Sequence, residues 1–479
     1  MSLDDVLLKR FTVEEFSREF LLYKALKTDI YTKNVLIPMG VDGVDYENFD
    51  KNLRYYAEKA CKRVHEGKYF FSPFRELDVP KPPYVNLSEA RKNNKVRTLS
   101  IATIRDVIFQ KLLYNSIEDF CEKQFNQLGE QVSFAYRKGK SAPLAVSNIY
   151  SSIRNEGFLY ALDGDIKKFF DEIPHDKLYQ KLENFFGVEN TLTLKYLKRF
   201  FSADRVEYSD YHGNVKKYYN RKPKRKIREK GIPQGGVLSG LIANIYLHDF
   251  DTYVVKDLYS KYDYQIKYFR YADDFLVLFK NDKIIGRVFE DIRTFLQAEG
   301  LIVHDIGEKT KVIDMSSHKK GKVEFLGFEI SSKGIGVKQA NIQKFKNRVI
   351  EIVESTKMYK NSPQKGLKIM VDRLRYKILG NYAFEQSLNI CELCGKERQE
   401  RNWLSYFLIL TDVRILRSLD VWLRKVIYRS YFNKTGKRLR KSTLKQLDIP
   451  SLERLYYKYK RDIRKEKEYC HCIMIDEDI

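Results

Sequence analysis

The sequence predicts a mixed α+β fold in which a few short strands are surrounded by helices. Three stretches support this prediction. Apolar residues recur at helical spacing in IRDVIFQKLLYNSIEDFCEKQF (104–125). FLYALDGDI (158–166) is an apolar run that ends in acids, and FRYADDFLVLFK (269–280) has apolar and aromatic runs on both sides of a turn. The first stretch is therefore expected to form a long helix, and the other two are expected to form strands.

The composition indicates a basic protein that binds a polyanion. The chain has 479 residues, 43% of them hydrophobic, which suffices for about two to four domains. Its 88 Lys and Arg against 64 Asp and Glu give a net charge of +24, so nucleic acid is the first expected partner and an anionic membrane surface the second. No apolar run approaches the roughly 18 residues of a spanning helix, so we expect no membrane partner. The start, MSLDDVLLKRF, has acids where a signal peptide has bases, and six cysteines do not make a disulfide framework, which favours the cytoplasm.

The other elements follow along the chain. We expect residues 1 to 120 to be mainly helical, interrupted by a loop at FSPFRELDVPKPPYVN (71–86), because the prolines at 80, 82 and 83 deny a helix. KVRTLSI (95–101) should form a strand. KKYYNRKPKRKIREK (216–230), with nine bases and one acid, is expected to be a solvated loop or hairpin, because so dense a charge run cannot pack. The later expected elements are an apolar helix at 237–250, an amphipathic helix at 284–300, a short strand at FLGFEI (325–330), and helices from about 340 onward.

Three acids form the candidate catalytic group. Asp165 ends a predicted strand, and Asp273 and Asp274 lie at the hairpin turn 108 residues later. If these strand ends share one sheet, three carboxylates meet there, as two divalent metals about 4 Å apart require. Oxygen ligands select Mg²⁺, and such a pair activates a 3′-hydroxyl and stabilises a pyrophosphate leaving group. The alternative is that the Asp-Asp pair is only a polar hairpin tip.

An ordered set of motifs spanning residues 95–330 resembles a reverse transcriptase, most like the bacterial lineage related to group II introns. KVRTLSIATIRDVIFQKLL and SFAYRKGKSA resemble fingers motifs, and GDIKKFFDEIPHDKL, GIPQGGVLSGLIANIYL and RYADDFLVL match palm motifs. GEKTKV and EFLGFEI match a later palm element and the primer grip. The resemblance implies a right-hand polymerase with fingers at 1–155, a palm at 156–335, a helical thumb at 336–430 and a basic C-terminal extension at 431–479.

The resemblance also implies roles for single residues. Asp165, Asp273 and Asp274 would hold two Mg²⁺ ions, assisted by the Ile166 carbonyl. Asp163 shares the face of Asp165 and would be a supporting acid at most. Phe170 would exclude a 2′-hydroxyl, and Gln234 and Gly235, beside Pro233, would line the incoming nucleotide. The candidates for binding the triphosphate are Lys95, Arg97 and Arg105. Lys309 would lie near the leaving pyrophosphate.

The cysteines allow a second, structural metal site. CELCG contributes Cys391 and Cys394, and CHC contributes Cys470 and Cys472, which together suffice for a tetrahedral zinc site. The alternative is that these thiols are unrelated. Cys61 and Cys121 sit in helical patterns and are expected in the core.

The predicted function is RNA-directed DNA synthesis from dNTPs on an RNA template, which yields a DNA product. The segments 216–230 and 424–445, the second with nine bases and no acid, are expected to contact nucleic-acid phosphates. No endonuclease, ribonuclease H or integrase motif follows the palm, so the layout resembles stand-alone reverse transcriptases of bacterial antiphage defence that use a non-coding RNA. Two alternatives stay open, an intron maturase and a template-independent or protein-primed polymerase. The sequence also leaves the oligomeric state open.

Overall fold

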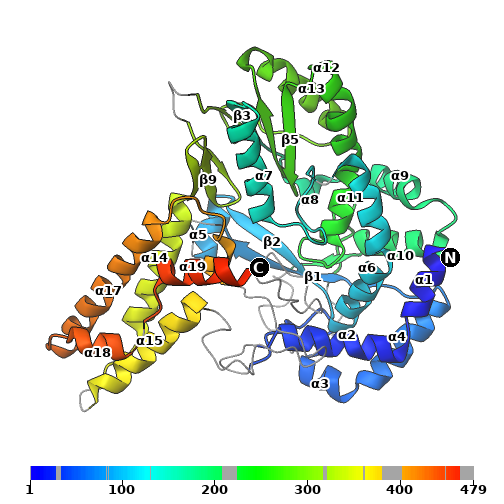
Figure 1. Ribbon diagram of the computed structural model, residues 1–479. Coiled ribbons are helices and arrows are strands. Elements are labelled where there is room, and N and C mark those ends of the chain that lie inside the picture. Colours follow the sequence, from blue (N-terminus) through cyan, green and yellow to red (C-terminus); the bar gives the residue numbers. More distant parts are fainter. Residues whose placement is uncertain are drawn as a thin grey trace. The chain divides into compact units, whose positions relative to one another are not determined.

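The computed structural model describes residues 2–28, 34–81, 84, 86–129, 131–207, 224–316, 321–359, 362–379, 402–447 and 449–463. The chain divides into two compact units (Figure 1). The first contains Met1–Ser141 and Leu162–Val312, and the second contains Ala142–Ala161 and Ile313–Met474.

The first unit contains a long buried helix, α6 (Ile104–Phe125), whose bounds match the prediction. Ile108, Phe109 and Leu112 of α6 are fully buried, and the Phe109 ring stacks on Tyr69 at 4.0 Å between centroids. The Thr103 hydroxyl accepts a hydrogen bond from a first-turn N–H and caps the helix. α6 contacts α1 (Leu3–Arg10), α2 (Val13–Leu26) and α4 (Leu53–His65), and α3 (Tyr46–Lys51) contacts α4.

The segment predicted as a loop at 71–86 contains a strand, so that prediction was wrong. β1 (Phe74–Pro80) pairs antiparallel with β2 (Val96–Ile101), and β4 (Arg205–Val206) adds to the other edge. The short helix α5 (Leu87–Lys92) connects β1 and β2. Proline ends β1 rather than interrupting it, where its missing N–H removes no central ladder bond.

A four-stranded sheet in the order β5-β6-β3-β7 carries the acids. Its strands are β3 (Tyr160–Asp165), β5 (Ile266–Tyr271), β6 (Asp274–Phe279) and β7 (Lys311–Asp314). All residues of β6 from Phe275 to Phe279 are fully buried, as a central strand requires. Gly164 of β3 lies against the Phe275 ring, where an added Cβ would fall 2.2 Å from the ring, so only glycine fits there.

The first unit also contains several further helices. The apolar helix α11 (Ser239–Thr252) and the amphipathic helix α13 (Ile285–Ala298) lie close to their predicted ranges. The remaining helices are α8 (Phe169–Glu172), α9 (His175–Phe186), α10 (Thr191–Phe201), a π-helix (Tyr253–Leu258), α12 (Tyr259–Lys261) and two short 3-10 helices (Asn126–Leu128 and Asp282–Ile284).

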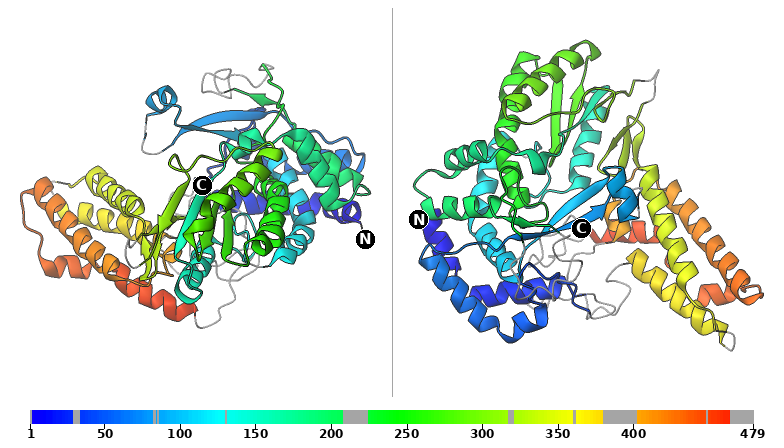
Figure 2. Two further views of the ribbon diagram at one scale, coloured as in Figure 1. Left: turned by 90° about the horizontal axis from the view of Figure 1, so that it is seen from above. Right: turned by 180° about the vertical axis from the view of Figure 1, so that it is seen from behind.

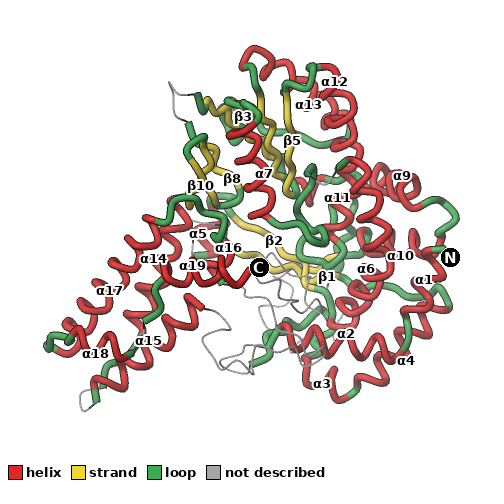
Figure 3. The backbone as a smooth tube through the Cα atoms, viewed as in Figure 1, coloured by secondary structure: helices red, strands yellow, loops and turns green. Residues whose placement is uncertain are grey.

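The second unit is mainly helical and has a small sheet in the order β10-β9-β8, drawn as yellow strands in Figure 3. The predicted single strand at 325–330 is a hairpin instead, in which β8 (Val323–Phe325) turns into β9 (Phe328–Ser331). The reason is local, because Leu326 and Gly327 both have positive φ (50° and 82°) and form a two-residue turn. The third strand is β10 (Gly334–Val337).

Long helices form the rest of the second unit. α15 (Pro363–Leu379) and α17 (Arg414–Thr435) both contact α14 (Gln339–Ser355), as Figure 2 shows. The boundary predicted after residue 430 falls within α17. The other helices are α7 (Ala142–Asn155), α16 (Trp403–Tyr406), α18 (Lys441–Gln446) and α19 (Leu452–Ile463).

Two further expectations concern membranes and cysteines. Within the described ranges, no helix combines the length and apolar content that crossing a bilayer requires. Cys61 and Cys121 are buried, as predicted. The four cysteines of the expected zinc site, Cys391, Cys394, Cys470 and Cys472, lie outside the described residues, so zinc stays a prediction.

Candidate active site

The β5–β6 hairpin presents two of the predicted acids. Tyr271 pairs with Asp274, so that Ala272 and Asp273 form the turn. Burial, followed by the negative charge of Asp165, raises the pKa of Asp273, while Arg97 and Lys309 oppose this shift. Desolvation by the surrounding protein, followed by the negative charges of Asp273 and Asp165, raises the pKa of Asp274 to about 8.

The third acid, Asp165, ends β3 and is bound by the segment that contains the EKT motif. The Lys309 ammonium donates a hydrogen bond to Asp165 Oδ2 at 2.5 Å. His304 Nε2 lies 3.3 Å from the same oxygen, and the His304 N–H donates to the Asp165 carbonyl at 3.1 Å. The other ring nitrogen of His304 lies 3.1 Å from Glu308 Oε2. Lys309, predicted to lie near the leaving pyrophosphate, therefore contacts Asp165, and its role toward the pyrophosphate stays a prediction.

The acids fit a divalent metal site by their charge and donor type. The charges of Asp273, Asp165 and Asp163 all raise the pKa of Asp274, so a cation bound among these carboxylates would reduce their mutual repulsion. Carboxylate oxygens are the ligands that Mg²⁺ prefers. As the side chains stand, no three His, Cys, Asp or Glu residues within the described ranges are gathered as a ready-made ligand set. Ile166 is buried and opposes Val303 in a single antiparallel bridge.

The loop with the PQG motif lies beside the helical turn that follows Asp165. The Phe170 carbonyl in α8 accepts a hydrogen bond from the Ile232 N–H at 2.7 Å. Gly231 has φ 76°, and an added Cβ would fall 2.7 Å from the Phe170 carbonyl oxygen, so this close approach requires glycine. The Gln234 carbonyl accepts from the Ser100 N–H on β2 at 2.7 Å. The structure thus brings Phe170 and the Gln234 loop together, with exposed Gly235 (φ 96°) next in the chain.

The three predicted triphosphate contacts are placed differently. Arg97 on β2 is exposed, and its charge reaches Asp273. Lys95 is also exposed, just before β2. Arg105 is engaged elsewhere, because its guanidinium donates to Asp106 Oδ1 at 2.8 Å and lies over the Tyr69 ring at 5.0 Å from the centroid.

Two residues near the acids were not predicted. His304 contacts Asp165, and its spacing of four residues from Glu308 was the available signal. Burial, then the positive charges of Arg97 and Lys309, lowers the pKa of Lys81, so this lysine lies near two bases whose charges reach Asp273. Lys81 directly follows β1 in the segment predicted as a loop.

The basic segment at 216–230 is only partly described, and its described end corrects one expectation. Residues 216–223 lie outside the described ranges. Arg228 is 7% exposed rather than solvated, and its guanidinium donates to Ser100 Oγ at 3.3 Å. Lys226 pairs with Arg205 in a backbone bridge, which draws this end of the segment onto the protein.

Comparison with known proteins connects this site to a family. The family described as "Reverse transcriptase (RNA-dependent DNA polymerase)" matches residues 79–330. The "Uncharacterized 91 kDa protein in cob intron" of Schizosaccharomyces pombe is 25% identical over 52% of this chain and 27% of its own. "Protein YkfC" of Escherichia coli is 23% identical over 65% of this chain and 80% of its own. The "Group II intron-encoded protein LtrA" of Lactococcus lactis is 22% identical over 77% of this chain and 62% of its own.

The match covers widely different shares of these relatives, from about a quarter to four fifths of their lengths. The family match, in contrast, covers more than half of this chain, including all three acids and the Gln234 loop. The chain therefore belongs to the reverse transcriptase family, has its right-hand polymerase fold, and is related to group II intron-encoded proteins.

Proposed function

We propose that the protein is an RNA-directed DNA polymerase that extends a primer with dNTPs. The observation that carries this proposal is the approach of Asp165, Asp273 and Asp274 at the end of one sheet, where their charges act on one another. These carboxylates, with the Ile166 carbonyl, would hold two Mg²⁺ ions. When bound, the ions supply Lewis acidity to the attacking 3′-hydroxyl and the leaving pyrophosphate.

The chain's own residues would bind and orient the nucleotide. Exposed Gly235 lets the backbone approach the substrate beside Gln234. Phe170 would block a 2′-hydroxyl and so select deoxynucleotides. Arg97 and Lys95 would offset the charge of the triphosphate, and Lys309 that of the pyrophosphate. Arg105 would have to exchange its bonds with Asp106 to join them.

We also propose a finer biological role, in which the template is a non-coding RNA bound by the protein and the pathway is bacterial antiphage defence. The resemblance to stand-alone defence enzymes and the net charge of +24 support this proposal. Sequencing the DNA made by the protein with its co-purifying RNA tests it. Products that all match one co-purified RNA support the role, and products from many unrelated RNAs contradict it.

The activity itself is tested with purified protein, labelled dNTPs and Mg²⁺, with and without ribonuclease. We expect labelled DNA that disappears after ribonuclease and in the Asp273→Asn, Asp274→Asn variant. Asp263→Asn is the matched control, since Asp263 is an exposed acid at the turn before β5, and its positive φ of 50° suits asparagine. DNA that survives ribonuclease would move the protein to template-independent synthesis.

An intron maturase is the second candidate function. The similarity to the Lactococcus lactis intron-encoded protein extends over 77% of this chain, well beyond the polymerase family match. A maturase is expected to promote splicing of an intron RNA even in the Asp273→Asn, Asp274→Asn variant. Absence of DNA synthesis under every condition, together with such splicing, would replace the polymerase proposal.

A further inference from the structure

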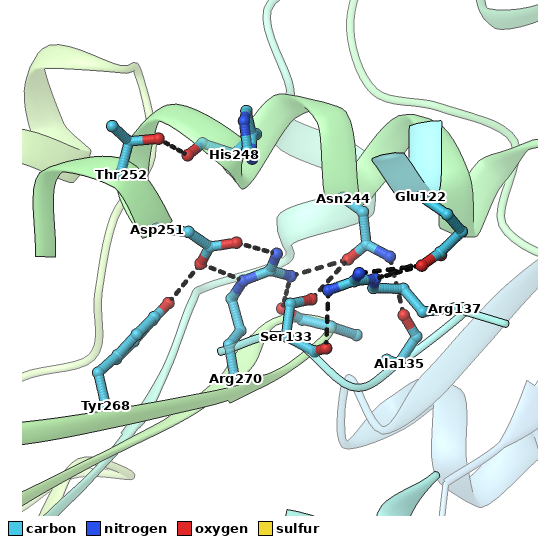
Figure 4. Close-up of polar contacts among 11 residues, drawn as sticks. Glu122, Ser133, Ala135, Arg137, Asn244, His248, Asp251, Thr252, Tyr268 and Arg270 are labelled. Carbon is cyan, nitrogen blue, oxygen red and sulfur yellow. Dashed lines mark hydrogen bonds and ion pairs between the residues drawn. The ribbon is translucent and has the colours of Figure 1, made fainter. Parts of the chain in front are cut away.

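A buried polar network lies directly under the turn that carries Asp273 and Asp274. Arg270 of β5 is 1% exposed, and its Nε and Nη2 donate to the two oxygens of Asp251 at 2.7 and 2.6 Å (Figure 4). Its Nη1 donates to Asn244 Oδ1 at 2.9 Å and to the Ala272 carbonyl at 3.1 Å. All donor nitrogens of the guanidinium are therefore used, and one of them reaches the turn.

The same network also binds the segment at residues 132–137. The Arg270 N–H donates to the Val132 carbonyl at 2.8 Å, and the Arg270 carbonyl accepts from the Phe134 N–H at 3.0 Å. Asn244 Nδ2 donates to the Ala135 carbonyl at 2.8 Å, as Figure 4 shows. Asn244 thus connects this segment to the guanidinium that contacts the turn.

Stability alone does not explain the buried ion pair between Arg270 and Asp251. Replacing a buried pair by apolar side chains of similar volume is often neutral or stabilising, because both ions must leave water. Asp251 is 2% exposed and accepts a further hydrogen bond from the Tyr268 hydroxyl at 2.9 Å. The bond from Arg270 to Ala272, in contrast, has a specific consequence, because Ala272 has φ 56°, a conformation that an L-residue seldom adopts without support.

We propose that Arg270 is a positioning residue that holds the turn through the Ala272 carbonyl and so sets the direction of the Asp273 and Asp274 carboxyls. Asp251 and Asn244 fix the plane of its guanidinium. The expected effect on catalysis rests on the proposed polymerase function, whereas the expected effect on the turn rests on the contacts alone.

Arg270→Lys is the test variant, because a lysine keeps the charge opposite Asp251 but lacks the planar fork that reaches Asn244 and Ala272 together. We expect hydrogen exchange in the peptide covering residues 271–275 to rise by about 10-fold or more. We also expect kcat for dNTP incorporation to fall by about 10- to 100-fold with little change in KM, since misplaced catalytic groups slow the chemical step. Binding of Mn²⁺ to RNA-free protein, measured by calorimetry, should weaken as well.

Tyr268→Phe is the matched control, because it removes a bond to Asp251 and leaves the contact with Ala272 in place. We expect wild-type exchange at 271–275, wild-type kcat and wild-type Mn²⁺ binding in this variant. If Arg270→Lys does not fold, Asn244→Ala is the second variant, since it keeps the ion pair and removes the acceptor that orients Nη1. It should raise exchange at the turn by at least about 3-fold.

Unchanged exchange at 271–275 and unchanged Mn²⁺ binding in a folded Arg270→Lys or Asn244→Ala protein would overturn the inference, whatever happens to the melting temperature. Equal effects of Tyr268→Phe and Arg270→Lys on the turn would do so too. Failure of the wild-type protein to make DNA would contradict the proposed function only, because exchange and Mn²⁺ binding are measured without turnover.

Discussion

The fold holds the two acids at the β5–β6 turn close together although their negative charges repel each other. Asp273, Asp165 and Asp163 all raise the pKa of Asp274, and Lys309 and Arg97 are the bases whose charges reach the pair. Such a site favours cation binding, because a bound cation offsets the repulsion between the carboxylates that the fold leaves in place.

Phe170 is the residue on which sugar selectivity is expected to depend. We predict that Phe170→Val admits ribonucleotides by removing ring atoms beside the 2′ position. The ratio of kcat/KM for a dNTP to that for the matching rNTP should fall by about 10- to 100-fold. Primer extension with single nucleotides measures it. Phe169→Leu is a suitable control, since Phe169 is buried and its ring lies 5.5 Å from that of Phe170. Equal ratios in wild type and Phe170→Val would contradict the role.

Two glycines at the second position of their helices predict opposite responses to alanine. At Gly240 of α11 an added Cβ would fall 2.3 Å from the Tyr136 ring, whereas at Gly286 of α13 nothing lies within 4 Å. Gly240→Ala should cost about 1–3 kcal/mol of unfolding free energy through overpacking. Gly286→Ala should be neutral or stabilise by up to about 1 kcal/mol through helix propensity. Urea denaturation measures both, and a stabilised Gly240→Ala protein would contradict the packing argument.

Asp42 predicts a pH dependence of stability. Burial, followed by the charge of Asp106, raises its pKa to about 6. Because the folded carboxyl holds its proton more tightly than the unfolded one, its contribution falls as the pH rises from about 4 to about 6. Asp42→Asn keeps an acceptor for the Val44 N–H and removes the buried charge. We expect stabilisation of up to roughly 3 kcal/mol at pH 7.5 and almost none at pH 4, measured by urea denaturation. Equal gains at both pH values would show that the charge is not the cause.

At the scale of elements, side chains from one helix cap the ends of another. Lys434 near the end of α17 donates hydrogen bonds to the carbonyls of Val353, Glu354 and Thr356 at the end of α14. Such carbonyls have no partner within their own helix, so the lysine both satisfies them and matches the helix dipole. Asp420 plays the complementary role at a helix start.

Asp420 of α17 caps α19, and its loss is predicted to weaken the second unit. Its carboxylate is 6% exposed and accepts from the Ser451 hydroxyl at 2.6 Å and the Leu452 N–H at 2.8 Å. Asp420→Ala should cost about 1–3 kcal/mol, because buried donors lose their acceptor. Glu351→Ala removes an exposed acid paired with Arg348 and should cost at most about 0.5 kcal/mol. Similar unfolding free energies for the two variants would refute the capping role.

At the scale of the whole molecule, the net charge of +24 is the dominant property. Bases are spread over both units, including exposed ones on α17 and α18 such as Arg424, Lys425 and Lys441. A charge of this size attracts phosphate backbones without reading sequence, which suits the proposed polymerase, because a polymerase has to move along its template.

We therefore predict a steep salt dependence of binding to single-stranded RNA. Neutralisation of about six phosphates gives a slope of log K against log salt of about −4, or roughly 300-fold weaker binding in 200 mM than in 50 mM KCl. Fluorescence anisotropy with a labelled RNA measures this slope. Sucrose at equal osmolality should leave the affinity unchanged. A slope shallower than about −2 would contradict binding through phosphates.

Much of the site was readable before the structure, because its signals are local. The helix at 104–125, the hairpin around Asp273 and the strand ending at Asp165 follow from periodicity and short-range pattern, and the structure contains all of them. The ordered motifs also predicted the family that the comparison confirms. The helix, the hairpin and the strand each depend on residues within about twenty positions of one another, and the family prediction depends on the order of such short motifs along the chain.

The remaining features depend on residues distant in the chain. β1 forms in a proline-containing segment because β2 offers a partner, and the Arg105 guanidinium lies over the ring of Tyr69, 36 positions earlier in the chain, rather than being left free for a triphosphate. The contacts of Lys309 and His304 with Asp165, and of Arg270 with Asp251, join separate elements. Local pattern indicates which side chains are polar or apolar, but burial and long-range packing determine which charge meets which partner.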